Sequence, residues 1–154
     1  VLNGNLYRNI EWPVVVMLAA MIPVGQALET SGISLNIASF ISTTTAGMGL
    51  PWLILMVLVI TMFVSDIVNN AATAVIMAPI AANLAIQVGQ PVEPFLMAVA
   101  VGASCAFLSP IGHQCNTLVM APGNYKFGDY WRLGLPLECV IVAISIPMIL
   151  FVWT

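Results

Sequence analysis

Polar residues interrupt an apolar stretch at Ser65-Asp66-Ile67-Val68-Asn69-Asn70. The preceding segment, Pro51–Val64, is strongly apolar but shorter than the roughly 17–25 residues of a typical membrane-spanning helix. Apolar sequence that favours a helix resumes over Ala71–Val88. Irregular polar backbone at membrane depth is stable only where it is buried in protein or lines a cavity. The pattern therefore predicts a re-entrant helical hairpin over 51–88, with an ordinary loop between two full spans as the alternative.

A second interruption follows at Ser109-Pro110-Ile111-Gly112-His113-Gln114-Cys115-Asn116. It separates the apolar segments Pro94–Leu108 and Thr117–Ala121, so residues 94–121 are predicted to form one broken transmembrane helix. The alternative is a proline-kinked helix with a neutral polar lining. Two interrupted segments so close together indicate a transporter binding site near the middle of the membrane.

The composition of the chain agrees with a membrane location. Of 154 residues, 61% are hydrophobic and 6% are charged, and the mean hydropathy is +1.06. Soluble domains carry roughly 45–50% apolar and about 25% charged residues, so a water-soluble fold is excluded. The net charge of −3 excludes a nucleic-acid-binding module, which needs a basic surface. We expect an all-α integral protein that crosses the cell (inner) membrane several times.

The remaining segments complete a predicted topology. Residues 12–29 and 133–154 each carry enough apolar sequence to span a bilayer. Residues 33–48 mix Ser, Asn and Thr with apolar residues, which is typical of an interfacial helix. With this path the basic residues face the cytoplasm, as the positive-inside rule prefers: Arg8, Lys126 and Arg132. Three glutamates are expected at the interfaces: Glu29, Glu93 and Glu138.

Each interruption ends where helical sequence restarts. Asn70 precedes Ala71 and Asn116 precedes Thr117, so both asparagines are predicted to be helix N-caps. Two half-helix N-termini that face one cavity favour an anion without needing Lys or Arg. Carbonyl groups at the ends of the opposing half-helices, with Ser and Asn oxygens, suit a hard cation. Adjacent anion and cation sites are the requirements of a cation-coupled anion symporter.

Two ionisable residues at the interruptions have two interpretations each. Asp66 is a possible coupling carboxylate, because a carboxylate deep in a membrane is a functional candidate by default. Its alternative is a packing role with hydrogen bonds to nearby backbone. His113, the only histidine, either contacts the substrate or relays a proton, or it is a hydrogen-bonded structural residue.

The motifs around both interruptions resemble those of the divalent anion:sodium symporter family. Its second signature is similar to Asp66-Ile-Val-Asn-Asn-Ala-Ala-Thr-Ala-Val-Ile-Met-Ala-Pro79, and its second broken helix to Ala103-Ser-Cys-Ala-Phe-Leu-Ser-Pro-Ile-Gly-His-Gln-Cys-Asn-Thr-Leu-Val-Met-Ala-Pro-Gly123. The segment Tyr125–Pro136 resembles bacterial citrate-transporter-like and sulfate-permease-like members. The resemblance, which runs from Glu11 to the end, implies a homodimeric secondary transporter built from two inverted repeats. This chain would be the C-terminal repeat alone, without the N-terminal repeat of the same permease.

The resemblance also implies where ions and substrate bind. The cation ligands fall on four positions: Ser65, Asn69, Asn70 and the backbone of Gly112. With the capping argument added, the substrate site comprises Asn70, Ala71, Thr73, His113 and Asn116. Asn69 stands where the family has Ser, and Ala71 where it has Thr, so one hydroxyl for a carboxylate is lost. His113-Gln114-Cys115 replaces Thr-Pro-Pro, so a compact oxyanion such as sulfate fits at least as well as a dicarboxylate.

The predicted function is a secondary active transporter (symporter) of a divalent anion such as sulfate or a di- or tricarboxylate. Na⁺ or H⁺ is the expected coupling ion, with no other cofactor or metal. The expected partners are the small anion, the lipid bilayer, the N-terminal repeat and a second copy of the protein. A passive anion channel or a non-transporting membrane subunit is the alternative. An enzyme is not expected, because the chain has no HExxH or GxSxG motif and a single histidine.

Overall fold

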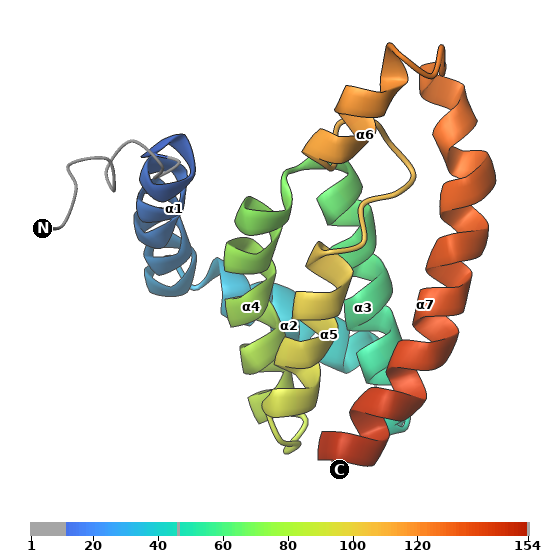
Figure 1. Ribbon diagram of the computed structural model, residues 1–154. Helices are drawn as coiled ribbons and strands as arrows, with labels where there is room; N and C mark the ends of the chain where they lie inside the picture. The colour runs from blue at the N-terminus through green and yellow to red at the C-terminus, as the bar shows by residue number, and fades with distance from the viewer. Residues whose placement is uncertain (1–11, 46, 154) are drawn as a thin grey trace, which may run out of the picture.

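A computed structural model describes residues 12–45 and 47–153, and every regular element within these ranges is helical. Arg8, used in the topology argument, and Thr154, the last residue of a predicted span, lie outside the described residues. Figure 1 shows the elements in chain order: α1 (Trp12–Thr30), α2 (Ile33–Thr44), α3 (Leu50–Ile67), α4 (Asn70–Gln87), α5 (Glu93–Ala103), α6 (Gln114–Met120), the 3₁₀ turn η2 (Phe127–Asp129) and α7 (Tyr130–Trp153). The predicted all-α class is confirmed.

The hairpin of α3 and α4, with α5 packed against both arms, forms the centre of the molecule (Figure 1). The interior is apolar and includes Ile54 and Leu58 of α3, Leu84 of α4, and Phe95 and Ala98 of α5, all with no exposed surface. α7 covers α3 and α5 on one side, while α2 and α1 pack against α4 on the other. The hairpin is therefore held by neighbours along both arms.

The ends of the central helices follow from proline and glycine. α3 and α5 both carry a proline in the first turn, where the missing N–H is not needed. α4 ends in a Schellman motif, in which Gln90 N–H donates to Ala85 O (2.9 Å) and Gly89 N–H to Ile86 O (3.2 Å). Gly89 has a φ of 66°, which glycine adopts without strain. The motif turns the chain from α4 into α5 at the end of the molecule where α3 begins (Figure 1).

Both interruptions differ in extent from the predicted polar runs. α3 continues through Ser65 and Asp66 to Ile67, so only Val68 and Asn69 are extended before α4 begins. The second interruption is longer, because α5 ends at Ala103 and α6 begins only at Gln114. We call residues 104–113 the broken segment. The apolar residues before Ser109 leave the helix because their backbone groups bind partners on other helices, as described below.

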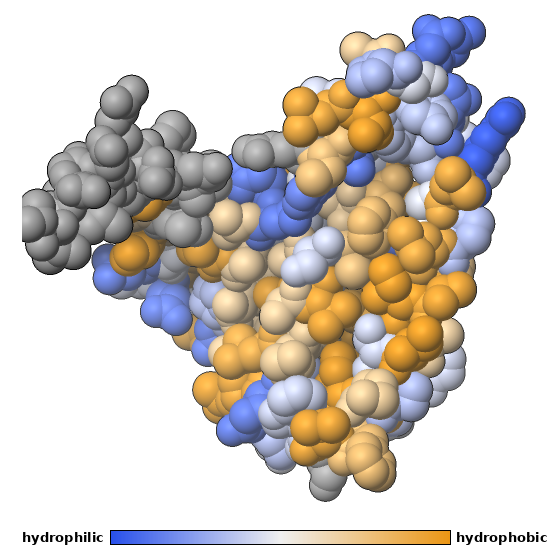
Figure 2. Space-filling view, viewed as in Figure 1, coloured by the Kyte–Doolittle hydropathy of each residue, from blue (hydrophilic) through white to orange (hydrophobic). Residues whose placement is uncertain are grey.

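Within residues 12–45 and 47–153, three helices have the length and composition to cross a membrane: Leu50–Ile67, Asn70–Gln87 and the continuous stretch Phe127–Trp153. Each hairpin arm has 18 residues, or about 27 Å, which is compatible with a re-entrant hairpin and with two thin spans. Of the apolar window of the last helix, only 6% is buried within the chain. Figure 2 shows apolar side chains over the α7 side of the molecule and polar side chains near the turn between α6 and α7. α7 therefore offers most of its surface to lipid or to other protein.

Candidate functional site

The end of α3 and the broken segment form one hydrogen-bonded unit. Asp66 Oδ1 accepts the backbone N–H of Leu108 at 3.0 Å, and the Asp66 carbonyl accepts the Ser109 hydroxyl at 2.6 Å. Gly112 of the broken segment lies so close to the end of α3 that a Cβ added to it would be 3.0 Å from the Ser65 carbonyl oxygen. The two interruptions, 42 residues apart at the Asp66–Leu108 bond, therefore meet in space.

Oxygen atoms gather around the Asn70 side chain at this meeting point. The buried Ser65 hydroxyl donates to the Ala103 carbonyl at 2.7 Å. In the orientation that satisfies the Asn70 amide, its nitrogen donates to the carbonyl oxygens of Ala103 (3.2 Å) and Gly112 (3.1 Å). Ser65 Oγ lies 3.0 Å from the same nitrogen, so the two amide hydrogens are shared among three oxygens. In the opposite orientation Asn70 Oδ1 is within reach of the Ser65 hydroxyl, which can donate to it at 3.0 Å, and it faces the two carbonyl oxygens, an arrangement that a bound cation would satisfy.

Asn69, the fourth predicted cation ligand, has a different contact. α4 begins at Asn70, so the N-cap is Asn69 rather than the predicted Asn70, and its Oδ1 accepts the Ala72 N–H at 2.8 Å. The extended backbone at Val68 and Asn69 directs the Asn69 oxygen to the cap and leaves Asn70, one residue later, facing the broken segment. The structure thus brings Ser65, Asn70 and Gly112 together and engages Asn69 as a cap.

The broken segment is held by side chains in place of helical hydrogen bonds. Asn116 Nδ2 donates to the carbonyl oxygens of Ala106 (2.9 Å) and Ser109 (3.0 Å), and Thr117 Oγ1 donates to Pro110 O (2.6 Å). These bonds satisfy carbonyl groups that have no helical partner. Asn116 lies inside α6 and is not its N-cap, which corrects the predicted capping role.

His113 is the N-cap of α6. Its Nδ1 accepts the Cys115 N–H at 3.2 Å, and its imidazole is exposed. The residue follows Gly112, whose carbonyl faces Asn70, so it flanks the oxygen cluster. The cap hydrogen bond agrees with a structural role for His113. The exposed imidazole remains accessible to a ligand.

The other two predicted substrate residues lie on the first turn of α4 at different depths. Ala71 is half-buried, whereas Thr73 is fully buried. The Thr73 hydroxyl has no hydrogen-bond partner among the described residues. Ala71 therefore keeps some accessible surface near the tip, whereas Thr73 is enclosed by the protein.

α7 contributes two residues whose part in the site the sequence reasoning missed. Gly134 lies against the broken segment, where an added Cβ would overlap the Phe107 carbonyl oxygen and approach Leu108 N to 3.2 Å. Glu138 accepts a backbone hydrogen bond from Phe107, and Asp66 is near enough for its charge to act on this carboxylate. Glu138 was expected at an interface, but its Oε1 is buried. A glycine and a glutamate four residues apart lie on the same helix face, and this spacing could have indicated from the sequence that both face the broken segment.

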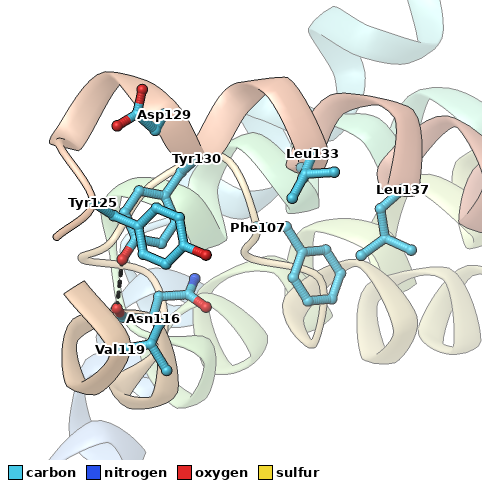
Figure 3. A pocket seen from close by; sticks show the side chains of 9 residues that line it. Phe107, Asn116, Val119, Tyr125, Asp129, Tyr130, Leu133 and Leu137 are labelled. Atoms are coloured by element: carbon cyan, nitrogen blue, oxygen red, sulfur yellow. Dashed lines mark hydrogen bonds between the residues drawn. The ribbon is translucent and has the colours of Figure 1, made fainter. Parts of the chain in front are cut away.

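A cavity of about 250 Å³ lies beside the broken segment, between α6 and α7. Figure 3 shows its lining side chains, with the Tyr130 hydroxyl donating to the Asn116 carbonyl at 2.7 Å. Asn116 and Phe107 belong to its wall, but Asn70, Ala71 and His113 do not. The cavity therefore shares no lining residue with the oxygen cluster.

Comparisons with known proteins agree on the kind of protein. A family described as citrate transporter matches residues 2–102 and, in an overlapping match, residues 46–154. An uncharacterized transporter of Synechocystis is 38% identical over 95% of the chain, and a probable sodium/sulfate cotransporter of Chlamydomonas reinhardtii is 31% identical over 94%. A sodium-dependent high-affinity dicarboxylate transporter of Caenorhabditis elegans is 29% identical over 91%. The chain spans 24%, 16% and 25% of the lengths of these three relatives.

Proposed function

The chain belongs to the citrate transporter family, and we propose that it is one inverted-repeat half of a sodium-coupled symporter for a divalent anion. The family and the relatives make it part of a multi-pass membrane transporter and not an enzyme. They also confirm the resemblance to divalent anion:sodium symporters that the motifs indicated. The anion we propose is sulfate or a di- or tricarboxylate.

The oxygen cluster around Asn70 is the observation that carries the proposed sodium coupling. A carboxamide can turn either its nitrogen or its oxygen toward the two carbonyls and the hydroxyl that surround it. Without a cation, the nitrogen donates to them. With Na⁺ bound, Asn70 Oδ1 joins Ser65 Oγ and the carbonyls of Ala103 and Gly112 as oxygen ligands, which hard cations prefer. The cluster contains no carboxylate, which favours a metal cation over a proton at this point.

The bound cation would attract the anion to the same place. The described basic residues, Lys126 and Arg132, are exposed around the turn that leads into α7 and do not belong to the oxygen cluster. Positive potential at the tip would come from Na⁺ and from the N-terminus of α4, with Ala71 and His113 flanking the anion. An anion that binds more tightly once Na⁺ is present is the thermodynamic basis of symport.

We propose that α3 and α4 are re-entrant. α3 begins and α4 ends at one end of the molecule, and the tip between them meets the broken segment between α5 and α6 (Figure 1). α5 has 11 residues, too few to cross a bilayer alone, so the break after it falls within the membrane. Because the tip is bonded to that break, it lies at a similar depth in the membrane. In the alternative of two full spans, the tip would be a loop at the far membrane surface.

The rest of the transporter would complete the site. We propose that the N-terminal repeat of the same permease supplies a matching hairpin and broken helix, and that two copies form a homodimer. Two features support this: the chain covers about a quarter of the Synechocystis relative, and α7 is almost unburied within the chain. α2, with 12 residues, would lie at the membrane interface.

The test is uptake by the full-length transporter in proteoliposomes. Labelled sulfate, succinate and citrate are offered under an inward Na⁺ gradient, under a pH gradient and under neither. We expect saturable accumulation of one of these anions that requires the Na⁺ gradient. Accumulation driven by pH alone would contradict sodium coupling, and a Na⁺-independent conductance would indicate the channel alternative.

A further inference from the structure

Glu138 lies beside the broken segment with one carboxylate oxygen unused. Its carboxylate accepts a backbone hydrogen bond from Phe107. The next amide along, that of Leu108, is bound by Asp66 Oδ1 at 3.0 Å. Within the described ranges, Glu138 Oε1 and Asp66 Oδ2 are both buried and have no hydrogen-bond partner. Two carboxylates thus hold consecutive amides of the broken segment, and each has one oxygen left over.

The surroundings of Glu138 offer no compensating charge. The titratable groups that face it are Asp66 from α3 and the Cys105 thiol from the broken segment, and neither is a cation. On its own helix, Cys139 is the next residue, and Arg132 is exposed and lies more than one turn away. Glu138 also borders a groove of about 450 Å³ with mostly apolar walls, including Met62, Phe63, Leu135 and Val142. An ionised Glu138 would therefore be a second negative charge in an apolar place.

We propose that Glu138 is a proton-binding site, in which Oε1 carries the proton and the other oxygen keeps the bond from Phe107. The proton comes from water and returns to water, and no other bond forms or breaks. The protonated carboxyl is neutral and has a hydroxyl donor, whereas the carboxylate is acceptor-only. Protonation leaves a single negative charge, on Asp66, next to the broken segment. The proton thus stabilises the arrangement that holds Gly112 against the hairpin tip.

This inference goes beyond the proposed sodium coupling, and its first test rests on that coupling. Sulfate uptake by the full-length transporter is measured at saturating Na⁺ from mildly alkaline to mildly acidic pH. Sulfate is the probe because it stays a dianion throughout this range, so the substrate does not titrate. We expect wild-type uptake to rise several-fold as the pH falls.

Glu138→Gln is the informative variant, because a carboxamide resembles the neutral acid in having one donor group and one acceptor. It should transport at close to the acidic wild-type rate at every pH. Glu93→Gln is the matched control, since Glu93 is exposed in the first turn of α5, and it should keep the wild-type pH profile. A wild-type profile in Glu138→Gln, or a flat profile in the wild type, would overturn the proposal.

A second measurement uses the unmodified protein and does not depend on transport. Dicyclohexylcarbodiimide is an apolar reagent that reacts with protonated carboxyl groups, and the groove beside Glu138 admits such a molecule. Mass spectrometry should find Glu138 labelled at acidic pH and progressively less labelled as the pH rises. Absence of label on Glu138 in folded protein at acidic pH would overturn the proton site. Loss of all sodium-driven uptake with intact labelling would instead overturn the proposed function.

Discussion

Replacing Asn70 by Leu removes the side chain at the centre of the oxygen cluster. The amide contacts Ala103 O, Gly112 O and Ser65 Oγ at 3.0–3.2 Å. The amide nitrogen has two hydrogens to donate, and at about 0.5–1.5 kcal/mol for each hydrogen bond their loss costs about 1–3 kcal/mol of stability without a cation. With Na⁺ bound, the variant lacks one oxygen ligand, comparable with a hydrogen bond to a charged group at about 1.5–3 kcal/mol. The loss in the cation-free protein offsets part of this loss, so the apparent Na⁺ affinity should fall by less than about 100-fold, since 1.4 kcal/mol is a factor of ten.

The assay is the Na⁺ dependence of initial sulfate uptake in proteoliposomes, with folding checked by size-exclusion chromatography. Asn83→Leu is the control, because Asn83 is an asparagine of the same helix whose amide donates to Ser34 Oγ at 3.2 Å, away from the tip. This variant loses one hydrogen bond and should keep the wild-type Na⁺ dependence. A folded Asn70→Leu protein with wild-type Na⁺ dependence would refute the assignment of the cluster as the cation site.

Three further predictions concern the tip and the broken segment. Gly134→Ala should lower the free energy of unfolding by about 1–3 kcal/mol, because the new Cβ overlaps the Phe107 carbonyl, although alanine normally stabilises a helix. The measurement is thermal unfolding, and Gly128→Ala is the control because its new Cβ meets no atom within 4 Å. Ala71→Thr and His113→Thr should each shift preference several-fold from sulfate towards succinate, since a hydroxyl bond is worth about 0.5–1.5 kcal/mol. Unchanged inhibition ratios in both variants would place these residues away from the anion. Val68→Cys is made in a protein from which the exposed Cys115 and Cys139 have been removed by substitution. It should react with an impermeant thiol reagent more slowly when sulfate is bound. Labelling that sulfate does not affect would favour two full spans.

The existence of the two interruptions could be predicted because their polar residues stand out against apolar sequence. Their extents could not, because they depend on contacts between segments distant along the chain. Asp66 stays helical at the end of α3 because it binds Leu108 N–H, and the same bond helps to keep Leu108 out of α5. A hydropathy pattern contains no information on such a pairing.

The caps show a similar limit. Asn69 and Asn70 are both good cap residues, and only the backbone at the tip assigns the cap to Asn69 and directs Asn70 to the broken segment. Asn116 was predicted as a cap from its place before an apolar run, but its amide instead bridges two carbonyls of the broken segment. Glu138 lies near one end of a strongly apolar helix, where an interfacial position is the usual expectation. Its inward direction follows from the close approach at Gly134.

The most direct measurement of the central claim is the simultaneous flux of labelled sodium and labelled sulfate through the full-length transporter. Proteoliposomes are loaded without Na⁺, and the entry of both ions is followed with and without the other ion outside. Sodium-coupled symport predicts that each ion's entry requires the other and that their initial rates keep a fixed ratio as either concentration is varied. Sulfate entry that proceeds at full rate with no accompanying sodium would contradict the account.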